Sequence, residues 1–313
     1  MRFEVTVLGS CAAAPKVDRH HSAHVLNVRE QFFLIDCGEG TQQQMMRAGI
    51  SPLKLSAVFI THLHGDHCFG LFPLLSTLSL LGRRTPLKLF APQPMQELLE
   101  GFDRYFNRES PFEIDYTPVD TRLHSLIHQT RTLEVYSIPL RHSIPSCGYL
   151  FREKQPPLNI RKSCIDRYGL GIAQIAAAKR GEAVRLHTGE VVPNEELTYR
   201  PFAPRSYAYC TDTHYSAKAA GLAKGADLLF HEATFADEER AAARQTGHST
   251  ASEAARFALR AEAGRLLIGH TSNRYKDPYL LERQARAIFP QTDLAVEGRT
   301  YSVAPKFNPE KGM

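Results

Sequence analysis

The chain has 313 residues, 43% of them apolar, and a formal net charge of +5. This length is enough for one large domain or two small ones, and the apolar share allows a sizeable core. No apolar run is long enough to span a membrane, and the N-terminus lacks a signal-peptide pattern, so we expect a cytoplasmic protein.

The six cysteines are scattered through the chain without a CxxC pair. At this length and density a disulfide framework is not expected, and the spacing favours free thiols in a reducing compartment. Most of them, including Cys68, should be small buried apolar residues.

The first half of the chain alternates predicted strands with predicted helices. Period-two or continuous apolar patterns predict strands, and longer amphipathic or apolar runs closed by glycine predict helices. The predicted strands are 3–9, 32–38, 55–62, 87–92, 112–119 and 132–140, and the predicted helices are 41–49 and 69–83.

The same alternation returns after residue 205. Thr250 followed by Glu253 is a capping-box pattern and marks the start of a helix. The predicted strands are 206–213, 226–235, 265–272, 292–296 and 300–303, and the predicted helices are 215–225, 250–263 and 279–289. Strands and helices that alternate through both halves predict α/β layers, with helices covering the sheet faces.

Residues 152–205 interrupt this alternation. Within them, 152–185 contain eight basic and three acidic side chains, which equals the whole net charge of +5. We interpret 152–205 as an inserted basic arm in a domain that spans 1–304, followed by a disordered tail at 305–313. A basic segment is typical of a polyanion-binding surface, although a solvated surface helix would have the same composition.

A cluster of ligand-type residues lies in the stretch FITHLHGDHCFG, directly after a predicted strand. His62 and His64 alternate by two and point to one side, Gly65 permits a tight turn, and Asp66 and His67 arrive from another direction. Imidazole and carboxylate groups suit Zn²⁺, and four such residues in six positions predict a metal site for two adjacent ions.

Three further candidate ligands share one position, the C-terminal end of a predicted strand. His142, Asp212 and His270 each follow such a strand, and the loops at these ends gather along one edge of a sheet. Taken singly, each could be a capping or structural polar residue. His231 and His248 lie in similar loops and are weaker candidates.

Several segments together resemble a known family. THLHGDH resembles the signature of the metallo-β-lactamase superfamily, and the surrounding blocks resemble ribonuclease Z, the tRNA 3′-processing endoribonuclease, from about residue 3 to 303. These blocks are LGSCAAAP, IDCGEGTQQQMMRAG, RHSIPSCGYLF, YCTDT, HEATF, GHSTASEAA and GHTSNRY. The resemblance implies a four-layer αββα sandwich, a dinuclear zinc site, a homodimer, and a protruding tRNA-binding arm at 152–205.

The resemblance also assigns roles to individual residues. One zinc would take His62, His64 and His142, the other Asp66, His67 and His270, with Asp212 bridging. Asp66 would also be the proton acceptor. In ribonuclease Z the first loop borders the active site, which makes Lys16 and Arg19 candidate substrate contacts.

Two further assignments follow from the chemistry of phosphodiester cleavage. His248 is our candidate acid for the departing 3′ oxygen, with Glu232 or another carboxylate orienting it. Arg274 and Tyr275 are candidate phosphate and nucleotide contacts, because arginine suits phosphate, although a surface salt bridge is the alternative for Arg274.

The arm departs from the family pattern, because it lacks a Gly-Pro motif, and residues 159–175 have a partly helical pattern instead. The leading hypothesis is a zinc-dependent endoribonuclease that removes 3′ trailers from tRNA precursors, leaving a tRNA 3′-hydroxyl and a 5′-phosphate on the trailer. The alternatives are a small-molecule phosphodiesterase or other hydrolase of the same fold, which has no use for a basic arm, and a non-catalytic RNA-binding relative, for which a complete ligand set is unexpected.

Overall fold

The computed structural model describes residues 1–107 and 110–307. The chain divides into two compact units. The first unit contains 1–129, 135–151 and 206–303, and the second contains 130–134, 152–205 and 304–307. Within the described residues, no helix is both long and apolar enough to cross a bilayer.

The first of two seven-stranded sheets changes direction in its middle. Its neighbours are antiparallel from β19 to β3 and parallel from β3 to β6. In sheet order the strands are β19 (Thr300–Ser302), β1 (Phe3–Gly9), β2 (Ala23–Val28), β3 (Gln31–Ile35), β4 (Leu55–Phe59), β5 (Leu87–Pro92) and β6 (Ile114–Val119). The associated helices are α1 (Thr41–Arg47), η1 (Pro52–Lys54), α2 (Gly65–Cys68), α3 (Leu71–Leu80) and α4 (Met95–Phe106).

The second sheet also has seven strands, and β15 to β18 are parallel. In sheet order the strands are β18 (Thr292–Leu294), β17 (Leu266–Gly269), β16 (Leu228–Glu232), β15 (Ser206–Cys210), β9 (Cys147–Glu153), β8 (Leu133–Pro139) and β7 (Leu126–Gln129). The associated helices are α8 (Ala217–Leu222), η2 (Asp237–Glu239), α9 (Arg240–Thr246), α10 (Ala251–Arg260) and α11 (Tyr279–Arg286).

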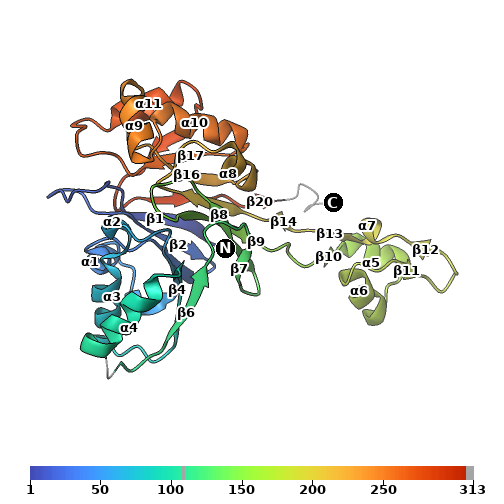
Figure 1. Cartoon of the computed structure of the whole chain (residues 1–313). Coiled ribbons are helices and arrows are strands. Elements are labelled where there is room, and N and C mark those ends of the chain that lie inside the picture. The colour runs from blue at the N-terminus through green and yellow to red at the C-terminus, as the bar shows by residue number, and fades with distance from the viewer. Residues whose placement is uncertain (108–109, 308–313) are drawn as a thin grey trace. The chain divides into compact units, whose positions relative to one another are not determined.

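Aromatic rings fill the space between the two sheets. Phe59 of the first sheet lies 5.3 Å from the Tyr149 ring of the second, and His24 lies 4.5 Å from Phe230. Helices cover the outer face of each sheet (Figure 1). The predicted αββα sandwich is therefore confirmed.

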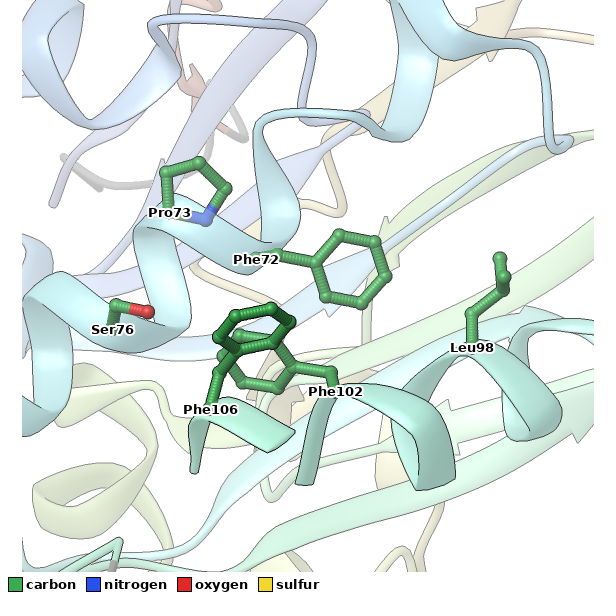
Figure 2. Close-up of a pocket in the computed structure, with 6 residues that line it drawn as sticks. All are labelled: Phe72, Pro73, Ser76, Leu98, Phe102 and Phe106. Atoms are coloured by element: carbon green, nitrogen blue, oxygen red, sulfur yellow. The ribbon is translucent and has the colours of Figure 1, made fainter. Parts of the chain in front are cut away.

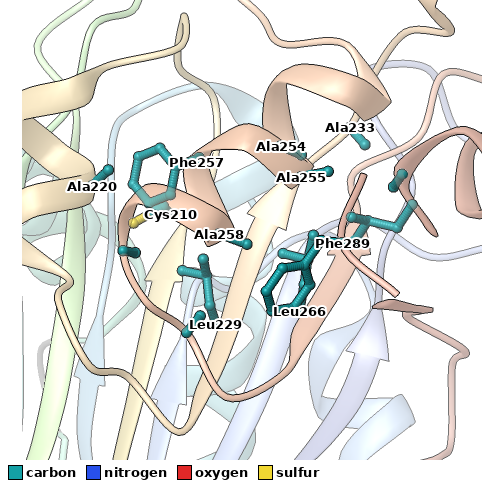
Figure 3. Packing of buried hydrophobic residues seen from close by; sticks show 14 of the residues in the cluster. Cys210, Ala220, Leu229, Ala233, Ala254, Ala255, Phe257, Ala258, Leu266 and Phe289 are labelled. Atoms are coloured by element: carbon teal, nitrogen blue, oxygen red, sulfur yellow. The ribbon is translucent and has the colours of Figure 1, made fainter. Parts of the chain in front are cut away.

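The second sheet and its helices pack through unusually small side chains. Ala254, Ala255 and Ala258 of α10 face Leu229 and Leu266, with Phe257 and Phe289 filling the remaining space (Figure 3). The predicted capping box starts this helix, since the Glu253 amide donates to Thr250 Oγ1 and the Thr250 amide donates to Glu253 Oε2 at 3.1 Å.

Helices α3 and α4 flank an apolar hollow of about 460 Å³. Phe72 of α3 and Phe102 and Phe106 of α4 line it, and Phe106 is largely exposed (Figure 2). None of the candidate ligand residues lines this hollow.

The second unit has a small core of its own. Seven buried residues form it, among them Cys164, Leu170 and Leu197. The expected helical character near residue 165 is confirmed. The elements are β10 (Asn159–Ile160), α5 (Lys162–Tyr168), α6 (Ile172–Lys179), β11 (Val184–Arg185), β12 (Val191–Val192), α7 (Asn194–Leu197), β13 (Thr198–Tyr199), β14 (Phe202–Ala203) and β20 (Lys306–Phe307).

The predicted tail begins too early. Lys306 and Phe307, inside the predicted 305–313 tail, pair with Ala203 and Phe202 as strand β20. Main-chain hydrogen bonds to β14 fix these residues, which the sequence pattern could not show. Residues 308–313 lie outside the described residues.

Candidate metal centre

The candidate ligands lie where strands of both sheets reach their C-terminal ends. His62 and His64 follow β4, His142 follows β8, Asp212 follows β15 and His270 follows β17. Asp212 and His270 have positive φ angles of 31° and 54°. Such a conformation is rare for these residues and persists only where the surroundings enforce it, as at functional sites.

The first group of donor atoms consists of three imidazole nitrogens and one oxygen of Asp212. His64 Nδ1 lies 3.1 Å from His62 Nε2 and 3.3 Å from His142 Nε2. Asp212 Oδ2 lies 3.6 Å from both His62 Nε2 and His142 Nε2. These four atoms surround one point, as the ligands of a metal ion do.

The second group adjoins the first through Asp212. His67 Nε2 lies 3.1 Å from His270 Nε2, and Asp66 Oδ2 lies 3.3 Å from the latter nitrogen. Asp212 Oδ1 lies 3.2 Å from His67 Nε2 and 3.4 Å from His270 Nε2. The two oxygens of Asp212 therefore face different groups, which is the geometry of a bridging carboxylate.

Four of the imidazoles are fixed through their second ring nitrogen. The partners of these Nδ1 atoms are Thr61 Oγ1 for His62, Asp36 Oδ2 for His67, the Gly247 carbonyl for His142 and Thr234 Oγ1 for His270, all at 2.8–3.0 Å. Such contacts set the tautomer and direct the other nitrogen toward the centre.

Asp36 is a functional residue that the sequence analysis missed. It is fully buried directly after β3, and it accepts hydrogen bonds from the Thr61 amide at 2.8 Å and from the Tyr209 hydroxyl at 3.1 Å. The same signal that identified the other ligands, a polar residue at a strand end, was present in the segment FFLIDCG. Its role is to orient His67 rather than to face the centre.

The charges of the centre favour a bound cation. Burial lowers the pKa of His62, His64 and His142, which keeps these imidazoles neutral and able to coordinate a metal. Burial would raise the pKa of Asp212, but the surrounding imidazoles outweigh it and lower that pKa well below its usual range. Three neutral imidazoles beside an ionised carboxylate fit Zn²⁺ or a similar divalent ion.

His248 lies at the edge of the centre with a buried carboxylate behind it. Its Nδ1 is 2.9 Å from Glu232 Oε1, and its ring is 5.0 Å from the ring of His142. Burial would lower the pKa of His248, but the Glu232 carboxylate outweighs it and raises that pKa to about 9. The expected pairing of His248 with Glu232 is confirmed.

The structure places His231 away from the centre. Its Nδ1 is 2.7 Å from the Glu232 carbonyl oxygen, and its ring packs 4.4 Å from that of Phe257.

Gly65 also differs from expectation, because it begins helix α2 instead of forming a tight turn. A Cβ at this position would lie 2.4 Å from the ring of Phe69, so a larger residue would require this exposed side chain to move.

The two candidate substrate contacts on the first loop, Lys16 and Arg19, differ in whether the side chain is already hydrogen-bonded within the protein. Lys16 is exposed on the loop after β1, whereas the guanidinium of Arg19 donates to Thr271 Oγ1 at 2.8 Å and to the Ser10 carbonyl at 3.0 Å. Arg19 therefore ties this loop to the residue after His270. The loop also approaches the centre itself, since the Ala13 amide donates to Asp66 Oδ2 at 2.8 Å.

Arg274 and Tyr275 share one glutamate. Arg274 Nη1 lies 2.7 Å from Glu239 Oε1, and the guanidinium lies 4.8 Å from the centre of the Phe235 ring. The Tyr275 hydroxyl donates to Glu239 Oε2 at 2.5 Å and accepts from the Ala236 amide. The salt-bridge alternative for Arg274 is thus what the structure shows, although its side chain remains 45% exposed.

Comparison with known proteins gives matches over nearly the whole chain. Residues 3–154 match the family model for the anti-Pycsar protein Apyc1, and 183–271 match the beta-lactamase superfamily domain. The chain is 44% identical to ribonuclease Z of Bacteroides thetaiotaomicron, over 96% of each chain. It is 42% identical to ribonuclease Z of Parabacteroides distasonis, over 96% of this chain and 99% of the other.

Solved structures agree with these relatives. Human tRNase Z, short form, superposes with a TM-score of 0.69 at 26% identity, over 96% of this chain and 99% of that chain. A diphosphatase of the PhnP family, 18% identical and with a TM-score of 0.63, shares the fold over 98% of this chain and all of its own.

Proposed function

The chain belongs to the ribonuclease Z family, and we propose that its histidine and aspartate centre binds two zinc ions and cuts 3′ trailers from tRNA precursors. It is a hydrolase of the endoribonuclease class that processes tRNA 3′ ends. The products are a tRNA 3′-hydroxyl and a trailer with a 5′-phosphate.

The observation that supports two metal ions best is the position of Asp212. Its two oxygens face two separate groups of donors, His62, His64 and His142 on one side and Asp66, His67 and His270 on the other. Bound zinc supplies a nucleophile at neutral pH, because it lowers the pKa of coordinated water to about 7, and it neutralises charge on phosphate.

Asp66 is placed to accept a proton. Its Oδ2 accepts from the Ala13 amide and faces His270, whereas its Oδ1 makes no hydrogen bond within the described chain. The side chain is 11% exposed and so is open toward the substrate side. A carboxylate fixed by one oxygen and free at the other can orient the attacking water and take up its proton.

His248 is placed to protonate the departing 3′ oxygen. Because Glu232 occupies its Nδ1 at 2.9 Å, Nε2 is the atom that can donate to the leaving group. Glu232 is in turn fixed by the Thr213 amide at 2.9 Å and the Thr234 hydroxyl at 2.6 Å. This chain of contacts keeps the imidazole oriented and stabilises its protonated form.

The segment 152–205 acts as the tRNA-binding arm in this proposal. Arg152, Lys162 and Lys179 are exposed and can contact phosphates, which gives affinity without reading sequence. Other cations of the arm are paired, since Arg180 Nε lies 2.6 Å from Glu182 Oε1. The affinity for tRNA should therefore depend on fewer charges than the composition of the arm indicates.

The proposal includes a cytoplasmic homodimer. All six cysteines are free, as is typical of proteins in a reducing compartment. Leu98 and Phe106, which line the hollow between α3 and α4, are 45% and 79% exposed. An apolar surface of this kind can meet its own copy across a two-fold axis.

The dimer is tested by light scattering on the purified chain. Phe106→Glu should convert a wild-type dimer to a monomer, because it places a charge in the apolar contact. A variant that stays dimeric would move the interface elsewhere.

The proposed activity is tested with a 3′-extended precursor tRNA and the metal-stripped chain. Adding zinc should restore cleavage, with full activity at two equivalents per chain, and end mapping should show a 3′-hydroxyl and a 5′-phosphate. Saturation at one equivalent would contradict the dinuclear centre, and the opposite end chemistry would contradict the proposed cleavage.

A further inference from the structure

A second hollow lies directly beside the metal centre. Its volume is about 860 Å³, and it is formed by residues 92–94, 118–122 and 139–146. These segments are the ends of β5 and β6 and the loop between β8 and β9, and they include His142 of the first donor group. The volume lies within the range of ordinary ligand sites.

The hollow and the loop at residues 10–20 flank the centre on different sides. In the second sheet, β17 and β8 lie on opposite sides of β15, so His270 and His142 lie on opposite sides of Asp212. The loop pairs with the His270 side through a bridge from Cys11 to Thr271. A strand of RNA with its scissile phosphate over the centre would therefore have one side on the loop and the other in the hollow.

The walls of the hollow suit nucleotides of any sequence. Leu140 and Ile144 are half-buried and offer apolar surface, together with five prolines, Pro92, Pro94, Pro118, Pro139 and Pro145. Apolar side chains can pack against the faces of bases, which all four bases possess. Ser146, 2% exposed, has a hydroxyl with no hydrogen-bond partner among the described residues.

Arg141 supplies an available positive charge. Its side chain is exposed and makes no ion pair with any described residue. The main chain here is fixed, since the Arg141 amide donates to Thr213 Oγ1 at 3.0 Å and its carbonyl accepts from the His214 amide at 2.9 Å. Arg122 in the same hollow is paired with Asp120 at 3.2 Å and is less available.

We infer that this hollow binds the first nucleotides of the 3′ trailer, and that Arg141 contacts the trailer's phosphate backbone. The inference rests on the proposed function. The loop side carries exposed Lys16, which the sequence predicts as a substrate contact. The hollow, in contrast, has the sequence-tolerant surface that trailers of varied sequence require.

The test compares an RNA that has a trailer with one that lacks it. For Arg141→Ala, KM for a precursor with a trailer of several nucleotides should rise about five- to tenfold, because a charged hydrogen bond is lost. The Kd for mature tRNA without a trailer should not change, and Arg141→Lys should recover part of the loss. Zinc content of each variant reports whether the neighbouring His142 still binds metal.

Arg84→Ala is the matched control. Arg84 is exposed before β5, at the end of that strand opposite to the hollow, and its removal changes the net charge equally. An unchanged KM in Arg141→Ala would overturn the inference, and an equal loss of mature tRNA binding would assign the hollow to the tRNA end instead. Absence of cleavage by the wild-type chain would count against the proposed function itself and not against the position of the trailer.

Discussion

The metal centre and the arm at 152–205 are built in opposite ways. In the centre, donor atoms are buried, and the second nitrogens of four imidazoles have fixed partners. In the arm, a core of seven buried residues supports exposed charges, two of them paired with glutamates. Chemistry needs fixed atoms, whereas contact with a phosphate backbone needs only charge at roughly the right place. Substitutions in the centre should therefore abolish cleavage almost completely. Substitutions in the arm should instead weaken tRNA binding by degrees that depend on salt.

The largest expected effect comes from Asp66→Ala. This change removes both a proposed metal ligand and the proposed proton acceptor, so kcat should fall by about 10³-fold or more on every substrate. The measurement is single-turnover cleavage of a 3′-extended precursor and of a small phosphodiester. Asp115→Ala, an exposed carboxylate on β6, is the control, and equal losses in both variants would remove the special role of Asp66.

His248→Ala should have the next largest effect. Loss of the proposed acid should lower kcat by about 10²-fold with little change in KM. Glu232→Gln should add little when combined with it, because the two side chains act as a unit. Fully additive losses, measured by a double-mutant cycle, would show that Glu232 does not act through His248.

Asp36→Asn tests the support behind the metal ligands. The change weakens the orientation of His67 without removing a ligand, so zinc affinity should fall by about 10- to 100-fold. Competition with a zinc-binding dye measures this affinity. If affinity stays at the wild-type value while the protein remains folded, Asp36 is a structural residue of the sheet interior.

In the arm, Lys162→Glu combined with Lys179→Glu should raise KM for precursor tRNA by about five- to tenfold at low salt, and by less at high salt. The rate on a small phosphodiester should not change. A defect that is the same at every salt concentration would point to misfolding of the arm.

The smallest effect is expected at the start of helix α10, two residues after His248. Thr250→Ala removes the cap of α10, where Thr250 Oγ1 accepts from the Glu253 amide, and should lower the free energy of unfolding by about 1 kcal/mol. Denaturant unfolding measures this loss, and cleavage at 25 °C should be unaffected. Lost cleavage would mean that the helix start contributes to the centre.

The positions of the seven predicted ligands could be found from the sequence because each follows a recognisable strand. Their grouping was implied by the family resemblance and not by the residue pattern, since the division of Asp212 between two donor groups depends on atoms brought together from both sheets. The anchors Thr234 and Gly247 were missed for the same reason. Helix α4 was also missed. Its sequence MQELLEGFDRYF has the amphipathic period of a helix, so it could have been predicted.

Side chains with several uses were the hardest to predict. Arg19 and Tyr275 resemble substrate contacts in sequence, yet both make internal hydrogen bonds in the structure. In the arm, composition gives the number of charges but not which of them a glutamate neutralises. Pairings of this kind arise only when distant segments pack together.

The most direct test separates phosphodiester hydrolysis by the centre from tRNA binding by the arm. Asn159 and Tyr199 are paired across β10 and β13, so residues 160–198 can be replaced by an Asn-Gly turn that closes the hairpin and removes the arm's core with it. The measurement is kcat/KM of this shortened chain on precursor tRNA and on a small phosphodiester. The account predicts a loss of precursor cleavage with the small substrate still hydrolysed. Unimpaired cleavage of the precursor would contradict it.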